Sequence, residues 1–228
     1  MADHMRVFYK YSLTIVLHFA FLYPVAQKSK DPKGYIVTLN NDTLPCVFKA
    51  RSWKKQPGKI NLKLAEKDTS FTPQSISGFI IPSLQIEYMS RIISPVKYID
   101  KLQNATTLKQ PEVVPAQASF LRVLHRGTFI LSLYLDDLSR KHFFVEAPDN
   151  LVELYSHYYL DPGDSRRIYD QPIAVLDKAF EFVLKTLMTP CRTIFSIIEN
   201  IELNEESLKA VFDIYDKCMI SKRTQTEN

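Results

Sequence analysis

A β-hairpin signal in residues 34–53 constrains the fold more than any other stretch of the chain. In two runs an apolar residue recurs at every second position, and an Asn- and Asp-rich segment separates the runs. The apolar positions are Tyr35, Val37 and Leu39 in the first run and Leu44, Cys46 and Phe48 in the second. Because side chains alternate between the two faces of a strand, each set shares one face, and the pattern predicts an antiparallel pair.

Two turn positions close this predicted hairpin. A turn at residues 41–42 pairs Leu39 with Leu44, whereas a turn at residues 40–41 slips the register by two and leaves the same side chains on a shared face. Asn and Asp both tolerate the positive φ angles that such turns need. In either register Cys46 lies on the apolar face, where a free thiol is commonly buried.

Strand patterns continue to about residue 160. Further strands are predicted at residues 60–64, 120–124, 129–135 and 142–145. Residues 151–160 are rich in Tyr and Leu and fit either a strand or a helix. Residues 101–118 contain two prolines and little periodicity, which predicts a long surface loop or an irregular edge.

The period changes to that of a helix after residue 170. One apolar stripe comprises Leu176, Ala179, Phe180, Val183, Leu184 and Leu187, with Asp170 or Gln171 as the expected cap. A second helix is predicted to start at Thr189, and Asn204 is a suitable N-cap for a third. Strands first and helices last predict an α+β fold: a mostly antiparallel sheet in residues 27–160, and a C-terminal helical segment with a helical hairpin in residues 161–228, packed as one structural unit.

Residues 1–26 are typical of a signal peptide. Arg6 and Lys10 precede an uncharged, mostly apolar run of 14 residues, 13–26. A membrane-spanning helix needs about 20 such residues, so the run predicts export and a mature chain without a transmembrane span. Beyond residue 26 the chain carries 27 basic and 24 acidic residues, a net charge of +3. That charge is small and scattered, so no nucleic-acid partner is expected.

Three cysteines allow one disulfide, and export favours its formation. Cys191 opens the second predicted helix and Cys218 closes the third, and the short connection between these helices makes them antiparallel. Their far ends should then meet, which predicts a Cys191–Cys218 bridge and leaves Cys46 free.

Several short motifs resemble a known family. They are Gly34-Tyr35-Ile36-Val37 with Asn40-Asn41-Asp42-Thr43, Thr72-Pro73 to Gly78-Phe79, Phe120 to Gly127 leading into Leu133-Tyr134, and Cys191 with Tyr215-Asp216-Lys217-Cys218. On these motifs the chain resembles a family of exported bacterial envelope proteins of unknown function, some of which carry a C-terminal outer-membrane β-barrel. Asn41 stands where the family usually has Gly, and no barrel is expected in this chain. The resemblance implies a periplasmic or outer-membrane-associated location and an envelope or outer-membrane protein as partner, and it supplies no catalytic residues.

The titratable residues form no catalytic or metal-binding spacing in the sequence. His125, His142 and His157 sit on separate segments, so no metal, cofactor or catalytic set is expected. The densest aromatic and basic cluster, a candidate binding surface or the cover of the joint between sheet and helices, comprises Tyr155, Tyr158, Tyr159, Arg166, Arg167 and Tyr169.

These observations favour an exported, non-catalytic envelope module that binds a protein or a surface polymer. One alternative is a periplasmic hydrolase whose site assembles around His125 or His142 with Asp136 or Glu153. Glu153 and His157 have i, i+4 spacing, which would suit an ion pair or a site if that stretch were helical. A second alternative is a soluble partner of an outer-membrane barrel.

Overall fold

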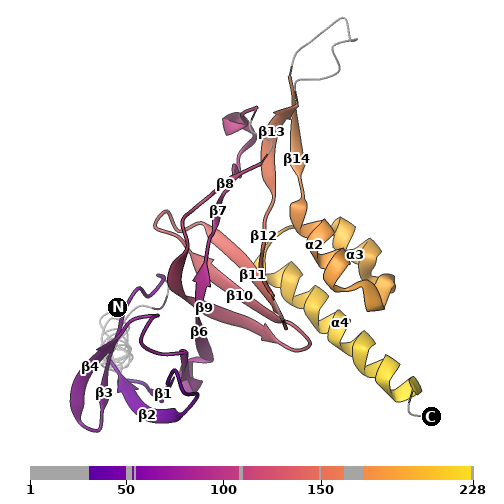
Figure 1. Cartoon of the computed structure of the whole chain (residues 1–228). Coiled ribbons are helices and arrows are strands. Elements are labelled where there is room, and N and C mark those ends of the chain that lie inside the picture. The colour runs from indigo at the N-terminus through magenta and orange to yellow at the C-terminus, as the bar shows by residue number, and fades with distance from the viewer. Residues whose placement is uncertain are drawn as a thin grey trace, which may run out of the picture. The chain divides into compact units, whose positions relative to one another are not determined.

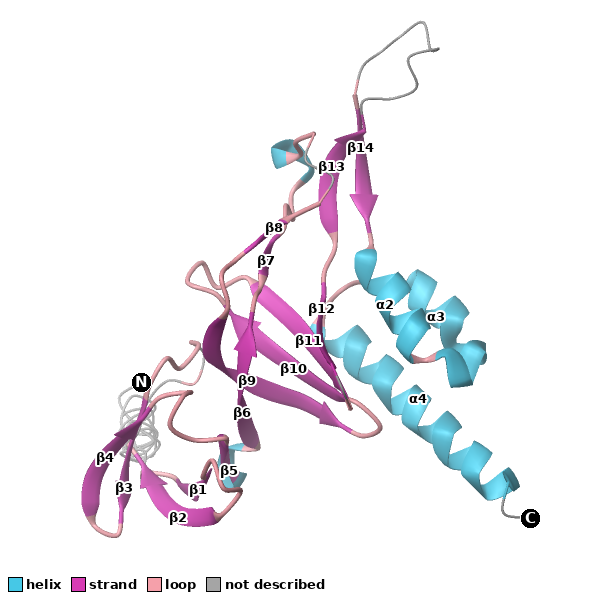
Figure 2. Cartoon of the chain, in the orientation of Figure 1, coloured by secondary structure: helices cyan, strands magenta, loops and turns pink. Residues whose placement is uncertain are grey.

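Strands occupy the first part of the described chain and helices the last part, so the fold is α+β (Figure 1; Figure 2). The computed structural model describes residues 31–49, 53, 55–107, 110–148, 150–161 and 172–226. The predicted signal peptide, residues 1–26, lies outside these residues. The chain from Pro32 onward forms one unit.

A ten-stranded sheet is the frame of this unit. Its strands are β1 Lys33–Val37, β2 Thr43–Phe48, β3 Ile60–Leu64, β4 Lys67–Phe71, β5 Gly78–Ile81, β6 Ile86–Ile93, β9 Gln117–Arg126, β10 Ile130–Leu135, β11 Lys141–Ala147 and β12 Asn150–Leu154. Their order is β12-β11-β10-β9-β6-β5-β1-β2-β3-β4, and neighbouring strands are antiparallel. The strands predicted at residues 60–64, 120–124, 129–135 and 142–145 are all present, within a few residues.

Shorter elements complete the chain. Two small ladders pair β7 Val96–Lys97 with β8 Glu112–Val113 and β13 His157–Asp161 with β14 Ile173–Asp177. The 3-10 turns are η1 Pro82–Leu84, η2 Leu102–Asn104 and η3 Thr189–Ile194, and the α-helices are α2 Ala179–Leu187, α3 Phe195–Asn200 and α4 Glu205–Thr226. The expected irregular stretch 101–118 contains η2, β8 and the first residues of β9. No helix in the described residues has the length and apolar character required to cross a membrane.

The first hairpin forms as predicted, but both predicted registers are wrong. Thr38 N donates to Asp42 O at 2.9 Å, and Asn41 has a φ of 66°, so three residues rather than two close the turn. An odd shift exchanges the faces of a strand. Ile36 therefore faces the core and Tyr35 is exposed, while Cys46 is a buried free thiol as predicted.

The first predicted helix begins later than expected. Residues 173–177 form strand β14, paired with β13, and α2 starts at Ala179. The segment 161–228 is therefore not all helical. The ambiguous stretch 151–160 forms parts of two strands, β12 and β13, so Glu153 and His157 lie on different strands and not one helical turn apart.

The helices cover one face of β9–β12. Phe180 and Leu184 of α2 and Phe212 and Tyr215 of α4 are almost fully buried against that face. The Tyr215 ring stacks on Phe129 with ring centroids 5.5 Å apart. Burial of each such side chain contributes about 1.5–3 kcal/mol, so this layer is a main source of stability. Asn204 caps α4 as predicted, accepting a hydrogen bond from Ser207 N at 2.9 Å.

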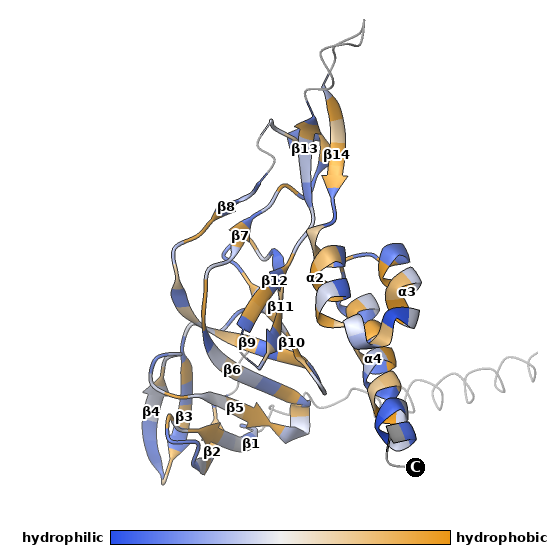
Figure 3. Cartoon of the chain, turned by 45° about the vertical axis from the view of Figure 1, so that its right-hand side comes forward, coloured by the Kyte–Doolittle hydropathy of each residue, from blue (hydrophilic) through white to orange (hydrophobic). Residues whose placement is uncertain are grey.

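Two further apolar clusters stabilise the rest of the sheet. One fills the β1–β6 half and includes Phe48, Phe79 and Phe120, against which Trp53 packs. The other includes Leu121, Tyr134 and Phe144 of β9–β11. Apolar and polar residues are interleaved along these strands (Figure 3).

The predicted cysteine pair is at disulfide distance. The Sγ atoms of Cys191 and Cys218 are 1.95 Å apart and their Cα atoms 6.3 Å apart. Cys191 lies in η3 rather than at the start of a regular helix, and α4 continues past Cys218 to Thr226. The bridge joins η3 to α4 and closes a sequence separation of 27 residues.

Candidate functional site

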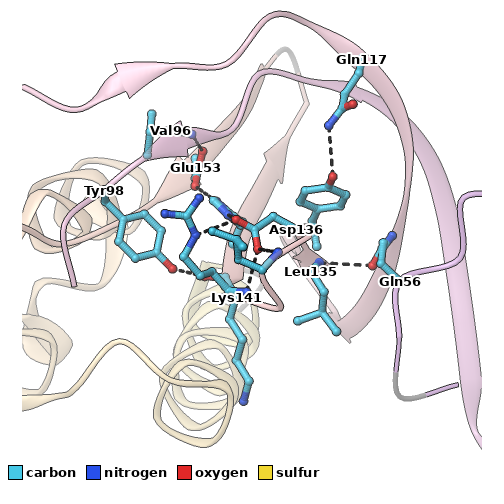
Figure 4. A network of polar contacts seen from close by, with 12 residues as sticks. Gln56, Val96, Tyr98, Gln117, Leu135, Asp136, Lys141 and Glu153 are labelled. Atoms are coloured by element: carbon cyan, nitrogen blue, oxygen red, sulfur yellow. Dashed lines mark hydrogen bonds and ion pairs between the residues drawn. The ribbon is translucent and has the colours of Figure 1, made fainter. Parts of the chain in front are cut away.

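A buried histidine, His142, lies between the carboxylates of Glu153 and Asp136, which Figure 4 labels within a network of polar contacts. His142 Nδ1 lies 2.7 Å from Glu153 Oε1, and His142 Nε2 lies 3.4 Å from Asp136 Oδ2. The side chains of His142 and Glu153 are only 2% and 7% exposed. The other oxygen of Glu153, Oε2, accepts a hydrogen bond from Val96 N at 2.8 Å. Both nitrogens of the ring therefore face carboxylates, and Glu153 also ties β7 to the sheet.

Asp136 organises the turn between β10 and β11. Its Oδ1 accepts hydrogen bonds from Leu138 N at 2.9 Å and Arg140 N at 2.8 Å, and its Oδ2 pairs with Arg140 Nε at 2.7 Å. Burial acts to raise the pKa of Asp136, but the hydrogen bonds from Arg140 and His142 outweigh it and lower that pKa. Asp136 is thus a fixed anion with its lone pairs engaged.

Tyr98 and Tyr134 enclose the imidazole of His142. Their ring centroids lie 5.4 Å and 5.8 Å from that of His142. The Tyr98 hydroxyl donates to Lys141 O at 2.7 Å. Burial, reinforced by the Glu153 carboxylate, raises the pKa of Tyr98 to about 12, so its hydroxyl stays protonated. The histidine is packed between rings and is not open to a substrate.

A second feature lies beside this network, where β9 and β10 separate. Their ladder ends with the pairing of Leu133 with Arg122, and two positions further in the same register Leu135 would pair with Phe120. At that position the Gln56 side chain intervenes: its Oε1 accepts from Leu135 N at 3.2 Å and its Nε2 donates to Phe120 O. The carboxamide of Gln56 thus occupies the place of a peptide group between the two strands.

We call this opening, between residues 117–120 of β9 and residues 134–137 at the end of β10, the fork. A cavity of about 600 Å³ lies in the fork, within the range of about 300–1,000 Å³ typical of ligand pockets. Its other walls are the loops at residues 55–58 and 72–74. Amides and hydroxyls dominate the polar lining: Gln56, Gln74, Gln117, Thr72, Ser119, Tyr134 and Ser139. Such a lining suits a neutral ligand with hydrogen-bonding groups.

The carboxylates and histidines named from the sequence fall into two groups. His142, Asp136 and Glu153 come together, whereas His125 belongs to a separate cluster with α4. His125 Nε2 lies 2.7 Å from Asp216 Oδ2, and Thr128 N donates to Asp216 Oδ1 at 2.9 Å. Burial acts to raise the pKa of Asp216, but the bonds from Thr128 and His125 outweigh it and lower that pKa.

The third histidine and the aromatic cluster take no part in either group. His157 is fully buried on β13 and its Nδ1 accepts a hydrogen bond from Ile99 N at 3.0 Å. Tyr158 and Tyr159 lie on the same strand, half-buried, and Tyr155 precedes it. The other members of the predicted surface, Arg166, Arg167 and Tyr169, lie outside the described residues. Within the described residues, no group of three or more His, Cys, Asp or Glu side chains could hold a metal ion.

Sequence patterns alone did not reveal the fork. Gln56, Gln117 and Tyr134 belong to segments far apart in the chain, and only the Pro57-Gly58 turn signal places Gln56 in a loop. Comparison with known proteins finds no family model, no curated protein and no solved structure that matches this chain.

Proposed function

We propose that this chain is an exported binding module of the cell envelope that recognises another protein or a surface polymer and catalyses no reaction. The observation that carries the proposal is the contrast between the two polar features. The fork offers a cavity with amide and hydroxyl groups on its walls, whereas the acid–base groups around His142 are buried and engaged with one another. A general base needs a nitrogen that can reach a substrate proton, and both nitrogens of His142 face carboxylates.

Location is the second part of the proposal. Support comes from residues 1–26, with their basic start and apolar run, and from the resemblance to exported envelope proteins. The Cys191–Cys218 pair at disulfide distance fits an oxidising compartment. Together these favour a periplasmic or outer-membrane-associated protein.

One observation favours the hydrolase alternative. Asp136 lines the cavity and contacts His142, so a substrate in the fork would lie close to two titratable groups. The lowered pKa of Asp136 opposes this alternative, because a carboxylate that stays ionised cannot donate a proton to a leaving group.

Turnover assays distinguish these functions. The purified mature chain, residues 27–228, would be tested against generic ester, phosphate, glycoside and peptide substrates, beside Asp136→Asn as the matched variant. The proposal expects no turnover by either protein. Turnover by the wild type that is lost in Asp136→Asn would refute the proposal and establish the hydrolase.

Binding is tested with the same mature chain immobilised on a resin. Solubilised envelope would be passed over it, and retained protein and saccharide would be quantified with and without free mature chain as competitor. The proposal expects retention that the competitor abolishes. A retained outer-membrane barrel would identify the protein as a barrel partner, and no competable retention of any component would refute binding.

A further inference from the structure

The fork has the geometry of an incomplete β-ladder. After a register shift between Leu131 and Ser132, β9 and β10 pair up to Leu133 and Arg122, and the Gln56 carboxamide then supplies one donor and one acceptor between them. A peptide group carries the same pair, an N–H and a C=O, so the Gln56 side chain demonstrates that an amide fits between the diverging strands. Beyond Gln56 the cavity takes the place of the next ladder positions.

The backbone of β9 directs further polar groups into the fork. Ser90 of β6 pairs with Phe120, but the Ser90 N–H donates to Ser77 O, on the side away from β9. In an antiparallel ladder, opposed residues either exchange both backbone hydrogen bonds or exchange neither, and the two kinds alternate. Phe120 and, two residues before it, Ala118 therefore turn their N–H and C=O groups away from β6 and toward the fork.

The opposite edge of the fork contributes in the same way. Leu135 N donates to Gln56 Oε1, and the C=O of a strand residue points to the same side as its N–H. The carbonyl of Leu135 thus also faces the fork. Donors and acceptors consequently lie along both edges of the fork. On β9 they belong to Ala118 and Phe120, two residues or about 6.6 Å apart. That spacing equals the two-residue repeat of an extended polypeptide.

Charge near the fork does not favour an ionic ligand. The carboxylate of Asp136 is paired with Arg140 Nε at 2.7 Å, and the exposed rim carries one residue of each sign, Lys55 and Asp137. Neutral main-chain groups match these surroundings better than a phosphate or a carboxylate does.

We propose that the fork binds an extended peptide segment of the partner, which continues the β9–β10 ladder beyond Gln56 through main-chain hydrogen bonds. This inference rests on the proposed binding function and specifies its ligand and its site. It corresponds to strand addition, in which main-chain bonds supply affinity and the flanking pockets select alternate side chains. Here Gln56 sets the register, because its carboxamide fills the first position.

The test uses peptides as the probe. A phage-displayed library of linear dodecapeptides would be panned on the mature chain. An enriched peptide would then be resynthesised in two versions, one with every odd-numbered amide N-methylated and one with every even-numbered amide N-methylated. In each version the methylated amides all point to the same side of the extended peptide. Methylation in the register that faces β9 is expected to weaken binding at least about tenfold, the effect of losing two main-chain hydrogen bonds. Amides of the other register face the edge of β10, where the Leu135 carbonyl is the one acceptor, so their methylation should weaken binding only about threefold, the effect of losing one such bond.

Binding is located by amide chemical shifts. Shifts in ¹⁵N spectra should concentrate at Ala118, Phe120, Leu135 and the Gln56 side chain. Ala118→Pro removes one N–H of the fork without removing a bond to β6, and it should weaken binding at least about threefold while the melting temperature stays within a few degrees. Gln103→Ala, which changes an exposed glutamine of η2 that does not line the cavity, is the matched control and should bind normally.

Three results would overturn the inference: no enriched peptide, enriched peptides equally sensitive to methylation in both registers, or shifts that lie outside the fork. An oligosaccharide from the envelope that shifts the fork amides when no peptide does so would also overturn it. In all these cases competable retention of envelope material would leave the proposed binding function intact, whereas loss of that retention would remove both.

Discussion

Gln56 offers the sharpest test of the structure itself, because one uncharged side chain connects three segments. Gln56→Ala removes the acceptor for Leu135 N and the donor for Phe120 O. Each hydrogen bond contributes about 0.5–1.5 kcal/mol net, so the loss should be about 1–3 kcal/mol. Water can enter the neighbouring cavity and partly satisfy both backbone groups, which favours the lower half of that range.

Gln56→Glu distinguishes the hydrogen-bond roles of the two side-chain atoms. At pH 7 the carboxylate can still accept from Leu135 N, but it presents an acceptor to the Phe120 carbonyl, so this variant should be about 1 kcal/mol less stable than Gln56→Ala. Below about pH 4 the carboxyl of the variant is protonated and can donate to Phe120 O. Folding thus raises the pKa of that carboxyl, and the stability this provides is present at low pH and is lost as pH rises.

Urea unfolding followed by tryptophan fluorescence measures these differences, since Trp53 is the only tryptophan and packs in the core of the β1–β6 half. The quantity to compare is the difference between Gln56→Glu and Gln56→Ala at pH 7 and at pH 3.5. Gln74→Ala, which changes an exposed glutamine of the same cavity, should stay within about 0.5 kcal/mol of wild type. If Gln56→Glu equals or exceeds Gln56→Ala in stability at pH 7, the carboxamide does not bridge the strands.

Three further predictions concern the rest of the molecule. Non-reducing peptide mapping of exported protein should recover Cys191 joined to Cys218, and reduction should lower the stability by about 3–4 kcal/mol, the chain-entropy value for a loop of this length; free thiols at both positions would contradict it. Asp216, whose pKa is lowered, should contribute about 1–2 kcal/mol above its ordinary pKa of about 3.9 and lose that contribution as pH falls through its lower folded value, so Asp216→Asn should flatten the acid side of a stability–pH curve. Limited proteolysis should cut first within residues 101–118, and a first cut within residues 129–135 would contradict the strand assignment there.

Local patterns predicted the elements whose signals are complete within a short stretch. The alternation of Phe129, Leu131 and Leu133 is enough to define a half-buried strand, and all three are buried in the core beneath the helices. The cap at Asn204 and the pairing of Cys191 with Cys218 depend on contacts between neighbouring elements, and short connections make such contacts predictable.

The predictions of the hairpin register and of the start of the first helix were wrong. The first hairpin has a three-residue turn with Asn41 at positive φ, and that single extra residue exchanged the buried and exposed faces of β1. Leu176 fits the helical stripe of the following residues, yet it belongs to β14, because pairing with Tyr158 of β13 overrides the local period.

The residues of the polar centre were named from the sequence within one alternative, but which of them come into contact could not be predicted, for a reason that also explains the fork. His142 and Glu153 lie on neighbouring strands, and their contact depends on the register of β11 and β12, which the spacing of 11 residues does not determine. Gln56 lies still farther from its partners, 64 residues from Phe120 and 79 from Leu135. A glutamine in a loop carries no sequence signal for this role, because the role exists only once two strands have diverged by the width of an amide.

The divergence itself follows from β9, which pairs with β6 from Gln117 to Arg122 while its partner β10 turns away at Asp136. This divergence of β10 from β9 creates both the place for Gln56 and the cavity beyond it. A peptide that continues the ladder would therefore occupy an opening that β9 and β10 leave between them.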